Sequence, residues 1–303
     1  MVNFVSSWAS PHPYELPPDS DLSLRVNIRT FLSLNLAFSF AGASVGLAQT
    51  AIVENFSTAG GLTGTTPTSG LSGATWTNIS GSTGLTVSSG ALTIAGAAGE
   101  AAQLNFNATD VATGTVYLGF DFTVNAAGSI STNDTVSAIV GFRSGTAASG
   151  NYALSFGDFR PSATAQTTSS APSTTTSQVA VGIFTSSSFN ASSAPLSVWS
   201  APLTRGTTYR VVLGFDATNN TGSLWINPTS INSTSISLTG VSNDPRGIFV
   251  REGATTHGSS TFDNLSVSTS FATASAIPEP STYAAIAGVV ALIGAVILRR
   301  RRK

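Results

Sequence analysis

The sequence predicts an all-β protein, an antiparallel β-sandwich or jelly roll, from three observations. Apolar and polar residues alternate with period two between residues 50 and 276, where helical periodicity is absent. Ser, Thr, Gly, Ala and Asn dominate, whereas Lys occurs once and the strong helix formers Glu and Gln are scarce. About a dozen short alternating segments separated by turn residues favour a single antiparallel sandwich.

The clearest strand covers residues 115–124, whose sequence is TVYLGFDFTV. One face of this strand is apolar and consists of Val116, Leu118, Phe120, Phe122 and Val124. A strand of this kind buries one face and leaves the other wetter. The other predicted strands cover residues 51–56, 74–79, 85–87, 91–96, 101–106, 135–142, 151–159, 178–184, 196–199, 247–252 and 260–268.

A β-hairpin is predicted for the segment TYRVVLGFDATNNTGSLWIN. Apolar residues alternate over 209–215, and the turn-rich segment DATNNTG follows at 216–222. The second strand covers 223–227 and ends before Pro228, because proline donates no ladder hydrogen bond.

Two further segments lack the strand pattern. Residues 166–177 hold nine Ser and Thr residues among twelve and predict an exposed polar loop, with an O-glycan carrier as the alternative. Residues 271–277 predict a linker between the sandwich, assigned to 49–270, and a separate C-terminal segment.

Composition excludes several classes of protein. The chain has no Cys, so it has no disulfide framework, thiolate nucleophile or Cys-ligated metal. Only 9% of its residues are charged, against about 25% in an average soluble domain. Residues 49–276 carry ten acidic residues and six arginines, and no basic patch, so nucleic acid is not predicted as a partner.

The N-terminal segment predicts secretion. Residues 31–47 are mostly apolar and follow two arginines, as in a signal peptide. Small residues end the stretch and predict signal-peptidase cleavage between Ala48 and Gln49, so residues 1–48 form the predicted signal peptide. Its first 24 residues hold four prolines and three acidic residues, which do not suit a basic n-region. We therefore expect that the encoded start lies too far upstream.

Three features follow one another at the C-terminal end. The motif Pro278-Glu279-Pro280 is stiff and extended, because each proline fixes its own φ and disfavours helix in the residue before it. Residues 284–298 are uninterruptedly apolar and predict a transmembrane helix. The last five residues are the basic cluster Arg299, Arg300, Arg301, Arg302 and Lys303. By the positive-inside tendency this cluster stays in the cytoplasm, so the body lies on the other side of the membrane.

The order and spacing of these features over residues 278–303 resemble the PEP-CTERM sorting signal of Gram-negative bacteria. The resemblance implies recognition of Pro278, Glu279 and Pro280 by an exosortase, a membrane-embedded cysteine peptidase. It also implies that the apolar segment is held in the membrane, that the basic cluster stops transfer, and that the tail is removed or exchanged. A plain single-span anchor is the alternative.

Two stretches of the body are similar to concanavalin-like, LamG-type sandwiches. GFDATNNTGSLWINP is similar to their late hairpin and TFDNLSVS to their closing strand. The matching positions are Phe215, Asp216, Trp225, Asn227, Pro228, Phe262, Asp263, Asn264 and Leu265.

No catalytic residue and no enzymatic activity are predicted. Glycoside hydrolases on this fold place two carboxylates on one strand, but no two acidic residues of the body lie within five positions of each other. The body has one histidine, His257, in a Gly/Thr/Ser-rich stretch that predicts a solvated loop. A single histidine also argues against a transition-metal site.

Calcium is the one cofactor that the sequence leaves open. Asp134 beside Asn133, or Asp216 near Asn219, offers oxygen ligands. Neither pair forms a dense acidic loop, so no metal ligand is predicted.

The indoles of the body, Trp76, Trp199 and Trp225, are candidates for stacking on sugar rings or for core packing. Trp225 points away from the face shared by Leu224 and Ile226. We expect Trp225 on the outer face of a sheet or against a second sheet.

Together these features predict an exported, exosortase-sorted surface or extracellular-matrix protein with a structural or adhesive role in exopolysaccharide or biofilm. Its expected partners are the Sec translocon, signal peptidase, exosortase and exopolysaccharide, with a transient anchor in the inner membrane. The alternatives are a carbohydrate-binding lectin-like module, a glycan hydrolase without the usual motif, and an ice-binding protein.

Overall fold

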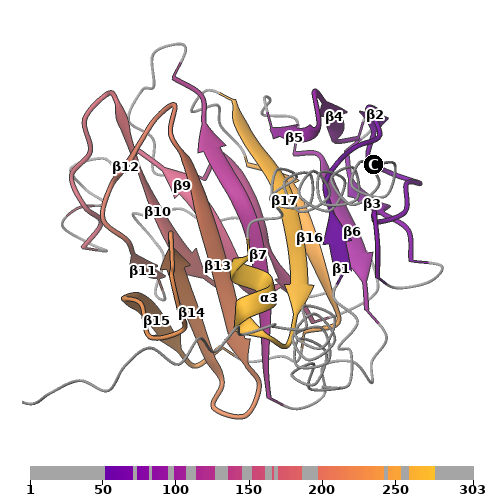
Figure 1. The fold of residues 1–303 in the computed structure, drawn as a ribbon. Helices are drawn as coiled ribbons and strands as arrows, with labels where there is room; N and C mark the ends of the chain where they lie inside the picture. The colour runs from indigo at the N-terminus through magenta and orange to yellow at the C-terminus, as the bar shows by residue number, and fades with distance from the viewer. Residues whose placement is uncertain are drawn as a thin grey trace, which may run out of the picture. The chain divides into compact units, whose positions relative to one another are not determined.

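Two antiparallel sheets pack face to face (Figure 1). The structure, a computed structural model, describes residues 52–70, 74–81, 84–94, 99–106, 114–126, 136–144, 152–160, 166, 170–185, 197–241, 245–253 and 259–276. Within these residues nine strands form the first sheet and eight form the second. The described strands pair antiparallel throughout, which confirms the predicted all-β antiparallel sandwich.

The first sheet has the strand order β15 (Ser235–Thr239), β14 (Thr221–Ile226), β13 (Thr208–Asp216), β7 (Thr115–Val124), β17 (Ser260–Ser268), β5 (Ala91–Ile94), β4 (Thr86–Ser88) and β2 (Gly60–Gly61), and β1 (Ile52–Glu54) also pairs with β17. The second sheet has the order β11 (Ser197–Trp199), β10 (Gln178–Phe184), β9 (Tyr152–Phe159), β8 (Ala138–Arg143), β16 (Gly247–Glu252), β6 (Ala101–Asn105) and β3 (Thr77–Ser80), and β12 (Leu203–Thr204) also pairs with β10.

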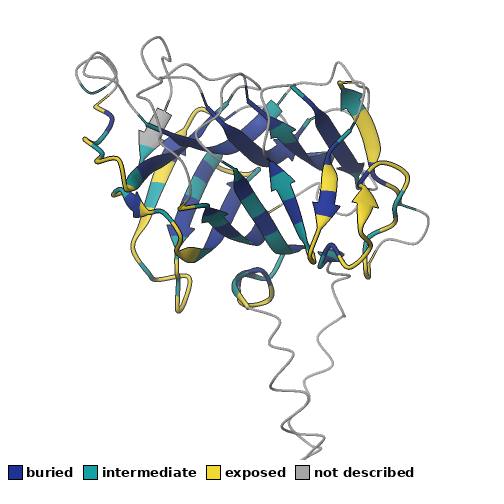
Figure 2. Cartoon of the chain, turned by 90° about the horizontal axis from the view of Figure 1, so that it is seen from above, coloured by how far each residue is buried: buried dark blue, intermediate teal, exposed yellow. Residues whose placement is uncertain are grey.

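The core lies between the two sheets and follows from the alternation of the strands (Figure 2). The apolar face predicted for β7 enters the core with all five of its residues. Rings from both sheets meet there. Phe120, Phe122 and Phe262 of the first sheet and Phe156 of the second make edge or tilted contacts with centroids 5.1 to 5.6 Å apart. Such pairs add about 0.5–1.5 kcal/mol each beyond the burial of their area.

The strand predictions are confirmed most closely where alternation is long. β7, β10, β16 and β17 have the predicted bounds, and the predicted hairpin is formed by β13 and β14. The strands β2, β12 and β15 are additions that the sequence pattern does not predict. Of the predicted polar loop at 166–177, the described residues are mostly exposed, but Ala171 is buried.

A bulge in β17 changes the face on which its residues lie. Asp263 pairs with Asp121, but Ser266 pairs with Gly119, so β17 holds one extra residue between these pairs. Asn264 takes a φ of 47° there, which Asn tolerates better than most residues. As a result Phe262 and Leu265, three positions apart, both enter the core.

The helix α3 (Phe271–Ser275) follows β17 and packs on the outer face of the first sheet against β7, β13 and β17 (Figures 1 and 2). The side chain of Ser270 caps it by accepting from the N–H of Thr273. Phe271 and Ala274 are its buried residues. The sequence predicts a linker over 271–277, whereas residues 271–275 are a packed helix, because Phe271 finds a partner surface on the sheet.

The buried guanidinium of Arg210, paired with Asp121, holds α3 in place. Nη1 of Arg210 lies 3.2 Å from Oδ1 of Asp121 and donates to the carbonyl of Asn264 at 2.8 Å. Nη2 of Arg210 donates to Oγ of Ser266 at 3.1 Å and to the carbonyl of Ala274 at 2.6 Å. Burial lowers the pKa of Arg210 and the nearby Asp121 charge opposes this. Because an arginine remains protonated in proteins, these are charge-assisted bonds between β13, β7, β17 and α3.

Gly119 of β7 makes the approach of α3 sterically feasible. A Cβ at this position would lie 1.8 Å from the carbonyl oxygen of Ala274 and 2.8 Å from Nη2 of Arg210. Any side chain at Gly119 therefore displaces the helix or the sheet.

Candidate functional site

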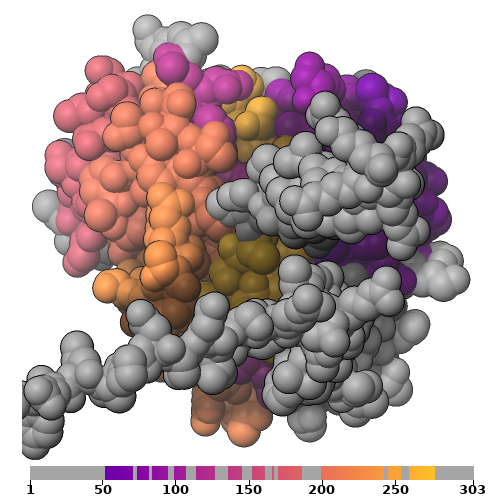
Figure 3. Space-filling view, viewed as in Figure 1, coloured from indigo at the N-terminus to yellow at the C-terminus, as the bar shows by residue number. Residues whose placement is uncertain are grey.

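The outer face of the first sheet combines aromatic and polar side chains beside α3. The register of β7, β13 and β14 places these residues in three rows across the sheet. The rows are Thr115, Asp216 and Thr221; then Tyr117, Gly214 and Ser223; and then Gly119, Val212 and Trp225. Figure 3 shows this face, with β13 to β15 in orange.

A depression of about 460 Å³ lies on this face. Gly214 lets both aromatic rings lie close to the sheet, because a Cβ there would lie 2.9 Å from the six-membered ring of Trp225 and 3.3 Å from the ring of Tyr117. The lining residues are Thr115, Tyr117, Gly214, Asp216, Asn219, Thr221, Ser223, Trp225 and Ile231. The site thus joins two aromatic rings with hydroxyl, amide and carboxylate groups.

The hairpin turn orients the carboxylate of Asp216. Its Oδ1 accepts from the N–H of Thr218 at 2.9 Å and of Asn219 at 3.1 Å, and its Oδ2 accepts from Nδ2 of Asn219 at 2.8 Å. The following Asn220 takes a φ of 52°, which closes the turn. The side-chain hydrogen bond from Asn219, followed by the backbone bonds, lowers the pKa of Asp216. Asp216 is therefore an ionised acceptor at neutral pH, with lone pairs left for a ligand.

Tyr117 supplies a ring and a protonated hydroxyl. Burial raises its pKa, a hydrogen bond with Thr115 opposes the rise, and the charge of Asp216 adds to it. The hydroxyl of Tyr117 therefore keeps its proton at neutral pH. Tyr117 and Trp225 are each 7% exposed, so only a small part of each ring is open to the depression. That part, beside a carboxylate, an amide and hydroxyls, suits the apolar face and the hydroxyl groups of a sugar.

Among the residues that the structure describes, no group of three or more His, Asp or Glu side chains comes together. Asp216 and Asn219 do converge, but Asp216 is the one carboxylate that lines the depression. The other pair with oxygen ligands, Asn133 and Asp134, lies outside the described residues. Calcium at Asp216 and Asn219 therefore stays a prediction from the sequence, with Asp216 as its one carboxylate ligand in the lining.

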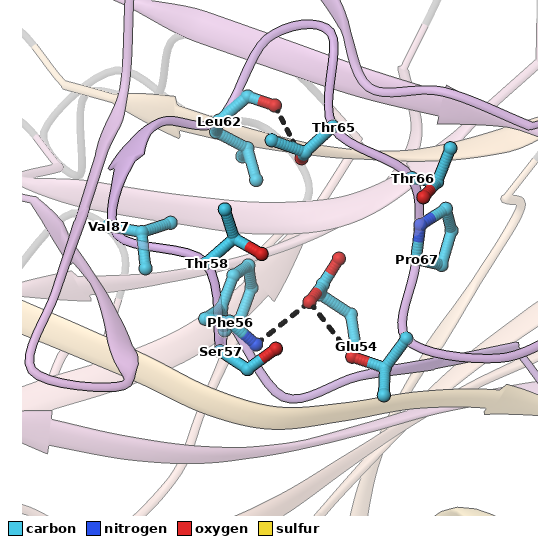
Figure 4. A pocket seen from close by; sticks show the side chains of 10 residues that line it. Glu54, Phe56, Ser57, Thr58, Leu62, Thr65, Thr66, Pro67 and Val87 are labelled. Atoms are coloured by element: carbon cyan, nitrogen blue, oxygen red, sulfur yellow. Dashed lines mark hydrogen bonds between the residues drawn. The ribbon is translucent and has the colours of Figure 1, made fainter.

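A second hollow, of about 290 Å³, surrounds the buried carboxylate of Glu54 in β1 (Figure 4). Oε1 of Glu54 accepts from the N–H of Phe56 at 2.8 Å, and Oε2 accepts from Nε1 of Trp76 at 3.1 Å. Oγ1 of Thr68 also donates to Oε1, at 3.4 Å. Both carboxylate oxygens are thus engaged by the chain itself, which ties β1 to the loop that follows it. Glu54 therefore has a structural role. Phe56, whose N–H donates to Glu54, takes a φ of 48°.

The three indoles have different environments. Trp76 is fully buried, and its indole N–H donates a hydrogen bond to Glu54. Trp199 is half-buried on the outer face of the second sheet and packs on Phe159 with centroids 4.9 Å apart. Trp225 lies on the outer face of the first sheet, as the alternation around Leu224 predicts.

Several predicted site residues lie outside the described residues. They are the cleavage positions Ala48 and Gln49, His257, the sorting motif Pro278, Glu279 and Pro280, and the basic cluster Arg299, Arg300, Arg301, Arg302 and Lys303. The predicted apolar span 284–298 lies outside them as well. Within the part of the chain that the structure describes, no helix has the length and apolar character needed to cross a membrane.

Tyr117 and Ile231 are site residues that the sequence pattern does not single out. Tyr117 is recognisable only as a residue on the wetter face of β7. Ile231 is half exposed at 50% and is the one large hydrophobic side chain among the described residues with such exposure. An exposed isoleucine in the loop after Pro228 is the signal that could have indicated it.

Comparisons with solved structures give partial matches at low sequence identity. The exoplasmic/lumenal domain of VIP36 has a TM-score of 0.43 at 8% identity, covering 73% of this chain and 92% of that one. A chain of botulinum neurotoxin type C, whose cell entry depends on interaction with two ganglioside molecules, has a TM-score of 0.41 at 10% identity, covering 75% of this chain and 49% of that one. A Trypanosoma rangeli sialidase in complex with sialic acid has a TM-score of 0.36 at 12% identity, covering 59% and 25%.

The chain therefore spans about half of the length of the neurotoxin chain that it matches. No family model matches the chain, and no curated protein matches it. The strand pairing described above, rather than these similarities, establishes the antiparallel β-sandwich.

Proposed function

We propose that this chain is an exported surface protein whose sandwich binds neutral, hydroxyl-rich glycans in the depression beside α3. One observation carries the proposal. Tyr117 and Trp225 line the same depression as Asp216 and Asn219, so aromatic rings stand next to oriented hydrogen-bonding groups. Sugar rings present an apolar face and a rim of hydroxyls, and these two kinds of side chain complement them.

The charge of the depression supports neutral glycans over acidic ones. Among the described residues of the lining, Asp216 is the only charged one, and the hydrogen bonds that lower its pKa keep it ionised. A uronate or sialate carboxylate placed beside Asp216 would meet a like charge without a basic side chain in the lining to offset it. Hydroxyl groups would instead donate to Asp216 in charge-assisted bonds.

Binding without catalysis fits the same lining. Hydrolysis of a glycosidic bond ordinarily needs a second carboxylate as acid or nucleophile. Asp216 has no such partner among the lining residues. The role that follows is adhesion to a polysaccharide matrix after export, with the predicted signal over residues 278–303 delivering the body to the cell surface through exosortase.

A glycan array, followed by calorimetry on the best ligand, tests the binding site. We expect neutral polysaccharides to bind. Asp216→Ala should weaken binding at least about tenfold, because a hydrogen bond to a charged group contributes about 1.5–3 kcal/mol. Thr86→Ala, at an exposed position of β4 several strands away from the depression and outside the lining, is the control and should bind as the wild type. Unchanged binding of Asp216→Ala would place the glycan elsewhere.

Sorting is tested separately in a host that contains an exosortase. The wild-type chain is expected at the cell surface with its C-terminal segment removed. Glu279→Ala, in the middle of the predicted motif, should leave the uncleaved chain in the inner membrane. Equal processing of the two chains would contradict the sorting proposal without affecting the glycan site.

A further inference from the structure

The aromatic part of the depression is packed directly against α3. Phe271 meets Tyr117 with ring centroids 5.4 Å apart and planes at 89°, and it meets Trp225 at 5.0 Å and 71°. Tyr117 and Trp225 lie 6.1 Å apart at 58°. The three rings, with Val212 and Ala274, form a hydrophobic cluster of their own on the outer face of the first sheet.

The orientation of Trp225 depends on packing. Its Nε1 is buried and has no hydrogen-bond partner among the described residues. The ring is therefore held by its contacts with Tyr117, Phe271 and the bare backbone of Gly214. Of these three, only Phe271 belongs to an element outside the sheet.

The position of α3 on the sheet is in turn fixed by residues that do not line the depression. The carbonyl of Ala274 accepts from Arg210 at 2.6 Å and from Oγ of Ser266 at 3.3 Å. Gly119 leaves the space into which this carbonyl fits. These contacts set the position of α3, and Phe271 transmits that position to the two rings that line the depression.

We propose that α3 is a positioning element of the glycan site: docked Phe271 fixes the rings of Tyr117 and Trp225, so the affinity for glycan depends on the docking of α3. This rests on the function proposed above. By linkage, a glycan that binds the fixed rings stabilises the docked helix to the same extent. The helix ends at Ser275, and the predicted sorting motif begins at Pro278.

The test compares glycan affinity and stability in variants of the full chain, with a neutral polysaccharide that binds the wild type. Phe271→Ala should weaken binding at least tenfold, and Phe271→Tyr, which keeps the ring, should stay within about threefold of the wild type. Val87→Ala removes a buried side chain of β4, which lies two strands beyond β17 and outside the contacts of α3, and serves as a control for general destabilisation. It should lower the unfolding midpoint and leave affinity unchanged. Ala272→Ser changes an exposed position of α3 and should alter neither.

A second measurement follows the effect of bound glycan on the docking of α3. Glycan at the wild-type dissociation constant should slow amide hydrogen exchange over residues 271–276 in the wild type, and the slowing should be much smaller in Asp216→Ala at the same glycan concentration. Wild-type affinity in Phe271→Ala, or equal loss of affinity in Val87→Ala, overturns the positioning role while the glycan site stands. Failure of the wild type to bind any neutral polysaccharide overturns the proposed function and the positioning role together.

Discussion

Replacing Gly119 by alanine tests how α3 is held on the sheet. The new Cβ would lie 1.8 Å from the carbonyl oxygen of Ala274, a distance that no side-chain rotation relieves because the atom it meets is backbone. The central strand β7 is fixed on both sides by β13 and β17, so we expect the helix to leave its place.

The expected cost follows from the contacts that are lost. Exposing Phe271 costs about 1.5–3 kcal/mol. Losing the bond from Arg210 to the carbonyl of Ala274 costs about 1.5–3 kcal/mol, since the donor is charged and buried. Together Gly119→Ala should lower the free energy of unfolding by about 3–6 kcal/mol. Because domains have a stability of about 5–15 kcal/mol, this loss is a large part of the total and is readily measured.

Urea denaturation followed by circular dichroism measures this cost. Gly61→Ala in β2 is the matched control, because a Cβ there meets nothing within 4 Å; it should change stability by less than about 0.5 kcal/mol. Phe271→Ala should add little in the Gly119→Ala background, where the helix is already displaced. A stability of Gly119→Ala equal to the control, or full additivity of the two changes, would refute the steric argument.

Three further outcomes are expected. Glu54→Gln should lower the free energy of unfolding by about 1–3 kcal/mol in urea titrations. The NH2 group of the glutamine cannot accept a hydrogen bond, so either the indole N–H of Trp76 or the N–H of Phe56 loses its acceptor. An unchanged urea midpoint would contradict the structural role of Glu54. Asp263→Asn should raise the urea midpoint at neutral pH and lose this advantage in acid. Burial raises the pKa of Asp263, so the folded chain holds the proton more tightly and loses stability as the pH rises through that pKa. An equal effect at both pH values would argue against this. Glycan affinity measured by calorimetry should stay constant between about pH 5 and about pH 9, because the pKa of Asp216 is lowered and that of Tyr117 is raised; a change of affinity near neutrality would implicate another group.

The fold could be predicted largely from alternation, because period two decides which face of a strand is buried. β7 shows this, since each of its five apolar alternate residues enters the core. β2 and β12 have two residues each, too few to carry a period, and in β15 only Ile236 and Leu238 interrupt a Ser/Thr run. Helix α3 has only Phe271 and Ala274 as buried positions, so its stability comes from docking rather than from a pattern visible in sequence.

The candidate site could be predicted only in parts. The sequence indicates Asp216 and Asn219 as oxygen donors and Trp225 as an outward indole, each for a separate reason. Their convergence with Tyr117 depends on cross-strand register, which pairs Gly214 with Tyr117 on one side and with Ser223 on the other. Register between strands that are about a hundred residues apart follows from the packed sheet and has no local signature.

The position of β17 in the first sheet has a consequence for the order of assembly. β17 is the last described strand in sequence, yet it lies inside the sheet, pairing with β7 along one edge and with β5 and β1 along the other. β1, the first described strand, can pair with it only after nearly the whole body has been synthesised. A chain threaded through a membrane from its N-terminus would therefore reach its native sheet late, after translocation of residue 268, and contacts this distant in sequence make closure slow.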